Sequence, residues 1–242
     1  MFYKKILALF CLFFASYANA AQCQESKCWL GHFGIGGAYY DFGSADISSY
    51  GAYISLEGKS VYYQRFQFAM GGRIGGGLTQ SSSIPFIESK APLFIFDAYV
   101  KIGANIATKS TPLFVNLVIE ADDHNGNIAS HNGIDRSLIL LGGELEGAMA
   151  ISPLTQLDYS LGYAWVGSGQ YVVNDIKSKV NNYSDEINAS IGFTRNISDN
   201  TGFYARLRGK YQNLQKALYQ NVQQFPASHN FVAMLEIGFK GL

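Results

Sequence analysis

His-Asn-Phe-Val-Ala-Met-Leu-Glu-Ile-Gly-Phe-Lys, residues 229–240, is the segment from which the fold of this chain can be predicted. Side chains alternate between the two faces of a β-strand, so Phe231, Leu235 and Phe239 share one apolar face. Glu236 and Lys240 lie on the other face. A strand with one apolar and one charged face is typical of a barrel that has lipid outside and a polar interior.

Nine further segments show the same alternation, with charged side chains on one face only. They are 29–42, 48–57, 61–74, 93–106, 113–120, 135–150, 157–165, 183–196 and 202–212. A charged side chain that faces lipid near the bilayer midplane costs about 2–4 kcal/mol. The alternative is a soluble barrel, but its apolar interior would exclude this many ionic groups. The pattern therefore predicts an all-β protein, a transmembrane antiparallel up-and-down β-barrel of about ten strands.

The last strand also resembles the C-terminal signal strand of Gram-negative outer-membrane β-barrels, which the outer-membrane assembly machinery reads. That family usually ends on the aromatic residue itself, whereas Gly241 and Leu242 follow Phe239 here. The resemblance implies the assembly machinery as a partner, and outer-membrane lipid and lipopolysaccharide as the surroundings. The expected localisation is the cell outer membrane, as a multi-pass monomer.

The first 20 residues have the three parts of a cleaved signal peptide. Lys4-Lys5 precede an apolar run over 6–14, and Ala18-Asn19-Ala20 supplies the small residues for cleavage after Ala20. The run is too short for a membrane-spanning helix, which needs about 20 apolar residues. Removal of residues 1–20 leaves 16 Lys and Arg against 18 Asp and Glu, a net charge near −2, and no basic patch indicates nucleic acid.

Cys23 and Cys28 lie in a periplasmic N-terminal segment, 21–28, before the barrel at 29–242. An exported protein meets oxidising conditions, which favours a disulfide between them. A metal site would need two further ligands. A loop this short makes the disulfide a local staple. No cofactor or metal site is predicted.

The connections between segments alternate in length. The short ones are expected at 58–60, 107–111, 151–154 and 197–201, and the others at 43–47, 75–90, 122–134, 168–182 and 213–228. Outer-membrane barrels have short periplasmic turns and longer extracellular loops. The alternation favours ten strands over eight or twelve, with both termini in the periplasm.

Charged residues on the inward faces are expected to form an ion-paired network. Its predicted members are Glu57, Arg65, Arg73, Asp97, Lys101, Glu120, Arg136, Glu144, Glu146, Glu186, Arg206, Arg208, Lys210 and Glu236, and Asp158 and Lys240 share their faces. Regular hairpins would place Glu120 across from Arg136 and Tyr53 beside Arg65. A lone charge in a narrow bore is costly, and ten strands leave little more room than eight. A plugged barrel is therefore favoured over a narrow channel lined by both signs.

The chain resembles small outer-membrane barrels of the opacity and OmpA-like class, and its strand number is similar to that of the omptin proteases. Omptins carry paired carboxylates and a His-Asp pair at the outer rim, and Asp122-Asp123-His124 is the nearest equivalent here. Asp-Asp-His-Asn-Gly-Asn consists of turn formers, which predicts a solvated loop instead. We expect a non-enzymatic barrel whose external loops mediate surface interaction or adhesion. The alternatives are a narrow small-solute channel and an outer-rim hydrolase.

Overall fold

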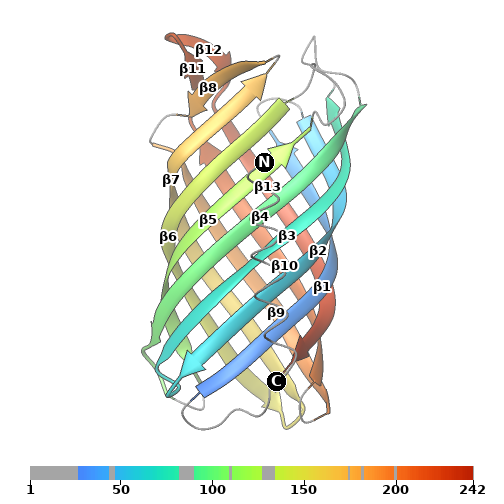
Figure 1. Cartoon of the computed structure of the whole chain (residues 1–242), viewed down its shortest axis with the longest axis vertical. Helices are drawn as coiled ribbons and strands as arrows, with labels where there is room; N and C mark the ends of the chain where they lie inside the picture. The colour runs from blue at the N-terminus through green and yellow to red at the C-terminus, as the bar shows by residue number, and fades with distance from the viewer. Residues whose placement is uncertain are drawn as a thin grey trace.

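The computed structural model describes residues 27–43, 47–81, 90–108, 111–126, 134–173, 175–180, 183–198 and 201–241. Ten long antiparallel strands close into a barrel (Figure 1). They are β1 (Lys27–Phe42), β2 (Ile47–Tyr62), β3 (Phe66–Ser81), β4 (Lys90–Asn105), β5 (Leu113–Asn125), β6 (Ile134–Ser152), β7 (Thr155–Val173), β9 (Asp185–Ser198), β10 (Thr201–Leu214) and β13 (Ser228–Gly241). The described part of the chain contains no helix long and apolar enough to span a membrane.

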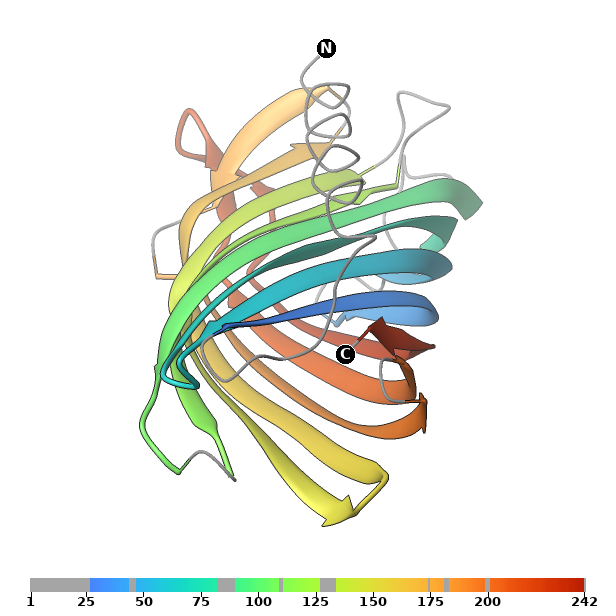
Figure 2. The same cartoon turned by 60° about the horizontal axis from the view of Figure 1, so that its bottom comes forward.

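The ring closes because the first and last strands pair. β1 and β13 are antiparallel neighbours, with Ile35 opposite Ile237. Consecutive strands pair around the rest of the ring, except that β7 pairs directly with β9 and β10 with β13. Figure 2 shows the closed wall from the end at which the chain terminates. The predicted ten-stranded, antiparallel barrel is confirmed.

Three short strands extend the wall at one end of the barrel. β8 (Ile176–Val180) continues the sheet from β7, and β11 (Ala217–Tyr219) and β12 (Val222–Phe225) continue it from β8. They stand beyond the rim at the top of Figure 1. We call this the loop end, and the end with the short connections the turn end. The sequence predicted only loops here.

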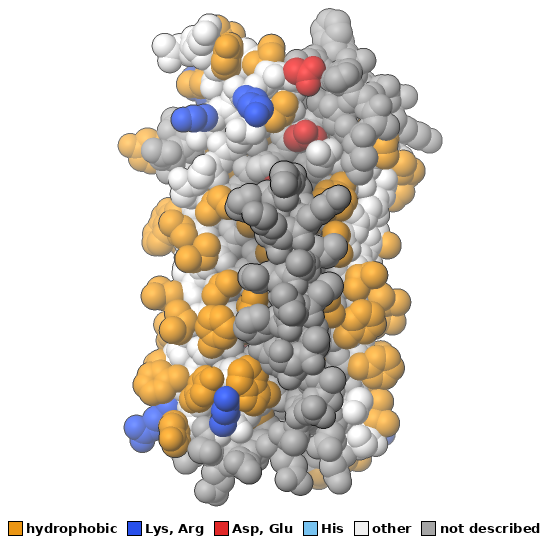
Figure 3. Space-filling view, viewed as in Figure 1, with side chains coloured by type: hydrophobic (Ala, Val, Ile, Leu, Met, Phe, Trp, Pro, Cys, Tyr) orange, Lys and Arg blue, Asp and Glu red, His pale blue; other side chains and the backbone are white. Residues whose placement is uncertain are grey.

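The outer surface is apolar, and its aromatic residues lie near the two ends. On β13, Phe231 and Phe239 flank Leu235, and on β1, Phe33 and Tyr39 flank Ile35. All six are between 45 and 59% exposed. Figure 3 shows charged side chains toward both ends of the described surface and hydrophobic ones between them. This is the arrangement of a lipid-facing band between two aromatic girdles.

The two faces of each strand separate as predicted. Leu161 and Ile191 are 56% and 53% exposed, whereas Glu144 and Glu186 are 5% and 0% exposed. Inward side chains therefore carry the ionic groups.

The predicted turn at 58–60 is wrong. Gly58 lies within β2, where it pairs with Gly31 on one side and Met70 on the other. The chain turns at 63–65 instead, where Tyr63 and Gln64 adopt positive φ angles of 52° and 57°. The apolar and polar alternation continues through Gly58, and the two ladders of hydrogen bonds override the preference of glycine for turns.

Three of the predicted loops are too long at their strand ends. Residues 75–81 belong to β3, 122–125 to β5 and 168–173 to β7. Glycines at 75–77 suggested a loop, but a Cβ at Gly77 would lie 2.0 Å from the carbonyl oxygen of Tyr50. Close approach of two backbones, rather than a bend, explains glycine there.

Candidate functional site

The barrel interior is the candidate functional site, and it changes character from the loop end to the turn end. At the loop end it is apolar: Phe42, Ile47, Leu138 and Leu214 are each 1% exposed. Phe225 of β12 reaches into this core and stacks on Tyr171 with ring centroids 4.1 Å apart. We call these residues the apolar cap. A polar interior was predicted throughout, so the cap corrects that expectation.

Below the cap lies a buried network that we call the upper ion cluster. Lys210 Nζ contacts Glu120, Asp122 at 3.0 Å and Glu186 at 3.9 Å. Arg136 donates to Asp122 Oδ1 at 2.5 Å. Lys210 and Arg136 are each 1% exposed. Charged groups this deep are stable only when they are paired and hydrogen-bonded.

Gln212 links the arms of the upper ion cluster. Its amide oxygen accepts from Arg136 at 2.5 Å and its amide nitrogen donates to Glu186 at 2.8 Å. The cluster therefore joins β5, β6, β9 and β10 across the bore. The apolar cap lies between this layer and the loop end.

A second cluster lies between the upper ion cluster and the turn end. Arg73 forms a forked contact with Asp97 at 2.9 and 3.0 Å, and its Nε lies 3.5 Å from Glu236. Tyr204 donates to Glu236 at 2.8 Å, and the Arg73 guanidinium lies 5.8 Å from the Tyr53 ring centroid. Aromatic and ionic groups fill this section together.

Toward the turn end the interior opens into a chamber of about 370 Å³. Gln64 of the turn at 63–65 and Pro112 before β5 line it, so it reaches the turn end. The chamber wall carries six Lys and Arg and four Asp and Glu side chains. Ser160 and Ser190 are hydrogen-bonded to each other at 2.8 Å on its wall.

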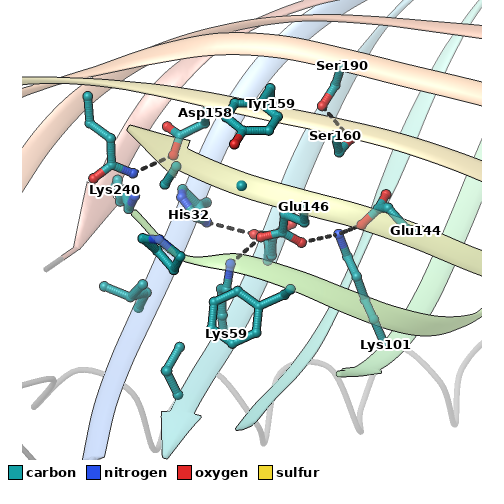
Figure 4. A pocket seen from close by; sticks show the side chains of 18 of the residues that line it. His32, Lys59, Lys101, Glu144, Glu146, Asp158, Tyr159, Ser160, Ser190 and Lys240 are labelled. Carbon is teal, nitrogen blue, oxygen red and sulfur yellow. Dashed lines mark hydrogen bonds and ion pairs between the residues drawn. The ribbon is translucent and has the colours of Figure 1, made fainter. Parts of the chain in front are cut away.

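The three glutamates of the chamber form ion pairs, and two of them are labelled in Figure 4. Lys101 contacts Glu144 at 2.7 Å and Glu146 at 3.0 Å, and Lys59 also reaches Glu146. On β2, two residues from Lys59, Glu57 accepts from Tyr99 and lies 3.0 Å from His32 Nδ1. Arg206 is 4.0 Å from Glu57.

The structure places most of the predicted network inside the barrel and groups it into the clusters above. The upper ion cluster holds Glu120, Arg136, Glu186 and Lys210. The middle cluster and the chamber hold Arg73, Asp97 and Glu236, and Glu57, Lys101, Glu144, Glu146 and Arg206. Arg208 lines the chamber, and no ion pair of its side chain occurs among the described residues.

Three expectations about this network are wrong. Arg65 is an exposed residue of the turn at 63–65, because β2 runs two residues beyond the predicted turn. Tyr53 lies opposite Gly75 in the ladder and so has no contact with Arg65. Glu120 lies opposite Leu140, while Arg136 lies opposite His124, because β5 extends to 125 and shifts the hairpin register.

The segment Asp122-Asp123-His124 is not a loop but part of β5. Asp122 and His124 point inward and are 4% and 1% exposed. Asp122 is bound by Arg136 and Lys210, and His124 Nε2 lies 3.0 Å from Ser49 Oγ. Ser49 is itself fully buried. A substrate has no access to these groups, so the arrangement differs from a catalytic rim.

Lys59, Asp122 and His32 take part in the interior network and were missed as members. Lys59 was assigned to a turn and Asp122 to a loop. Both share the inward parity of their strands, Lys59 with Glu57 and Asp122 with Glu120. Their inward parity was the signal that both belong to the network, but the turn-forming residues beside them led to the turn and loop predictions.

Cys28 is the second residue of β1, directly after Lys27, and is disulfide-bonded. Cys23 and the cleavage position Ala20 fall outside the described residues. Among the residues that the structure describes, no cluster of His, Cys, Asp and Glu could hold a metal ion.

No protein-family model and no curated protein matches the sequence. Among solved structures, the chain is similar to the outer-membrane protease OmpT from Escherichia coli, with a TM-score of 0.56 and 10% identity over 92% of this chain and 99% of OmpT. An outer-membrane channel from Pseudomonas putida F1 gives 0.44 and 11% over 93% and 98%. OprG from Pseudomonas aeruginosa gives 0.40 and 9% over 89% and 95%. The chain therefore has the closed antiparallel β-barrel fold that is found in outer-membrane proteins.

Proposed function

We propose that this protein is a non-enzymatic outer-membrane barrel that presents its loop end at the cell surface for interaction or adhesion. The apolar exterior between aromatic girdles supports a place in lipid. The short connections support periplasmic termini. Lipopolysaccharide and outer-membrane lipid are then its surroundings, and the protein acts as a monomer.

The proposal rests on one observation: side chains fill the half of the bore that lies toward the loop end. Phe225 and Tyr171 stack in the apolar cap, and Arg136, Asp122 and Lys210 form the paired layer beneath it. A solute would have to displace tightly packed apolar side chains and then separate buried ion pairs. Both steps are costly. A plugged interior leaves the surface of the loop end as the part that meets a partner.

The extension formed by β8, β11 and β12 supplies such a surface. Its sheet pairing holds the loops in place, with Ala217 opposite Val180 and Ala217 opposite Phe225. Val222 and Tyr219 are 60% and 45% exposed on it. Apolar and aromatic side chains on an ordered surface are suited to protein or glycan contacts.

A narrow channel is the second candidate, because the chamber already opens part of the bore from the turn end. Single-channel recording on the refolded protein in planar bilayers separates the two functions. We expect no conductance steps from wild-type protein. Stable, reproducible steps would contradict the plugged barrel and support the channel.

Surface substitution tests the interaction role. Replacing Ile176, Tyr219 and Val222 by Ser is expected to reduce adhesion of expressing cells to host-cell monolayers, or their aggregation with one another. The matched control replaces Tyr63, Ile106 and Ile151 by Ser at the turn end, where these side chains are 61–65% exposed. Equal adhesion in wild type, the loop-end variant and cells lacking the protein would contradict the proposal.

A further inference from the structure

We propose that the loop-end extension binds the phosphate groups of lipopolysaccharide through three lysines on its outer face, Lys177, Lys179 and Lys216. We call these three residues the lysine cluster. The site deepens the function proposed above, because it rests on the orientation given there, with the loop end at the cell surface and lipopolysaccharide around it. In that setting the lysine cluster anchors the extension to the surrounding outer leaflet.

The lysine cluster lies on the face of the extension that points away from the barrel interior. Lys177 and Lys179 flank Ser178 in β8, and Ser178 is only 1% exposed. Lys216 directly precedes Ala217 of β11, which is fully buried in the hydrophobic core. All three lysines are themselves exposed. Successive side chains of a strand point to opposite faces, so the buried neighbours place the lysines on the outer face.

The three lysines are close enough to act on one headgroup. Lys177 and Lys179 are two residues apart on one strand, which separates their Cα atoms by roughly 7 Å. Lys179 lies opposite Leu218 of β11, and Lys216 comes two residues before Leu218. Such diagonal neighbours on paired strands are roughly 7–8 Å apart. One phosphate group can therefore contact two of the lysines at once.

No residue that the structure describes forms an ion pair with the lysine cluster. Asp175, two residues before Lys177, interacts electrostatically with Asp135 of β6. Asp135 lies two strands away from Lys177, with Val172 between them. These carboxylates lie toward the Lys177 end of the cluster and offset part of its charge there. Like charges on neighbouring strands repel each other, and an anion that binds between them removes this repulsion.

The lysine cluster lies just beyond the lipid-facing band. Trp165 of β7 is 58% exposed on the outer surface, and Lys179 pairs with Gln170, five residues further toward the loop end. A tilted strand rises roughly 12 Å over five residues. Because Trp side chains are typical of the membrane–water interface, the cluster lies at the level of the lipid headgroups. Figure 3 shows Lys and Arg side chains near the loop end, above the hydrophobic band.

The phosphate groups of lipopolysaccharide fit this surface better than a soluble anion does. A lysine ammonium carries three N–H donors and is a common phosphate ligand. Basic side chains at a membrane surface are attracted to anionic lipid. The outer face of the extension continues the lipid-facing side of β7, so headgroups of the same leaflet are its nearest neighbours. Long lysine side chains can also bend toward the membrane.

Titration of the refolded full chain in detergent micelles with purified lipid A tests the proposal. The probes are diphosphoryl lipid A, chemically dephosphorylated lipid A and heparin, a soluble sulfated polymer. We expect saturable binding of diphosphoryl lipid A and binding of the dephosphorylated form that is at least about tenfold weaker, since each lysine contributes about fivefold. Equal affinities for the two forms of lipid A, or tighter binding of heparin than of diphosphoryl lipid A, would overturn the proposal.

Variants locate the site. Replacing the whole lysine cluster by Gln should weaken binding of diphosphoryl lipid A at least about tenfold, whereas replacing it by Arg should keep the affinity. The matched control removes three charges from exposed positions at the turn end and should bind like wild type: Lys27→Gln, Arg65→Gln and Arg195→Gln. Heat-dependent mobility in gels verifies that each barrel has folded. Equal affinities in the Gln variant of the cluster and in the turn-end control would also overturn the proposal.

The binding assay and the adhesion assay fail independently. Lipid A binding is measured on purified protein, so its absence contradicts the lysine cluster and leaves adhesion of whole cells to be judged by the loop-end Ser variant. Equal adhesion with and without the protein contradicts the surface role, and the lipid A titration still decides whether the lysine cluster binds phosphate.

Discussion

Gly36 marks a position at which a neighbouring strand's tyrosine takes the space of a side chain. A Cβ there would lie 2.4 Å from Tyr53 Cζ and 2.5 Å from the carbonyl oxygen of Leu235. At Gly34 the space is taken by Tyr204 of β10, two strands away, with 2.3 Å to the hydroxyl oxygen. Glycines beside inward tyrosines thus allow large rings to pack in a narrow bore.

Substituting two adjacent glycines tests this packing. Gly36→Ala is expected to lower the free energy of unfolding by about 1–3 kcal/mol, because the added methyl group overpacks the Tyr53 ring. Gly37→Ala is the control, since its outward Cβ would meet only the Gly51 carbonyl oxygen, at 3.8 Å. Urea unfolding in detergent micelles measures both. A control as destabilised as Gly36→Ala would contradict the explanation.

Two arginines that the sequence assigned to one network have different environments. Arg136→Ala should cost about 3–5 kcal/mol of unfolding free energy, because it leaves the buried Asp122 with one cation fewer. Arg65→Ala should change it by less than about 0.5 kcal/mol, since Arg65 is exposed on a turn. Equilibrium unfolding compares the two. Similar losses would show that the upper ion cluster is not a stabilising layer.

The sequence could predict which side chains of each strand point into the barrel. Glu144 and Glu186 were assigned inward because charge falls on one face, and that face is the inner one. Which inward groups meet could not be predicted, because contacts across a bore depend on register and on strands far apart in the chain. Lys210 and Glu120, for example, are 90 residues apart in sequence.

At the scale of elements, the strands were predicted well in their centres and less well at their ends. Leu138-Ile139-Leu140-Leu141 is apolar on both faces, as is Leu93-Phe94-Ile95-Phe96. Strands with apolar residues on both faces are buried on both sides. Lipid covers one side and the apolar cap the other. The inward residues of those two runs were the signal for the apolar cap, but only their outward residues were used to predict the fold.

The extension formed by β8, β11 and β12 is the element-scale feature that the sequence did not predict, whereas the pairing of β7 with β9 is the one expected of consecutive barrel strands. β8 leaves the barrel wall with β11 and β12, so β7 pairs with β9 and Leu161 lies opposite Ala189. Cysteines at Leu161 and Ala189 should cross-link with a short bifunctional maleimide in the folded barrel. Cysteines at Leu161 and Tyr219 should not. Cross-linking of the second pair alone would contradict this strand order.

At the scale of the whole molecule, the outer and inner surfaces of the barrel wall have different side chains and different surroundings. The outer surface contacts lipid through aliphatic and aromatic side chains. Among the described residues, the inner surface carries the apolar cap at the loop end, then paired ions, and a chamber at the turn end. Closure of ten strands makes both surfaces possible, because it leaves no unpaired edge in lipid.

Nitroxide side chains on adjacent residues of β7 and β9 test the central claim most directly. Leu161 and Ile191 point outward, and Ser160 and Ser190 line the chamber. In liposomes, we expect labels at 161 and 191 to be relaxed by oxygen, which concentrates in lipid, and hardly at all by a water-soluble nickel chelate. Labels at 160 and 190 should show little relaxation by oxygen. Strong oxygen relaxation at 160 and 190, with 161 and 191 shielded from lipid, would contradict the account.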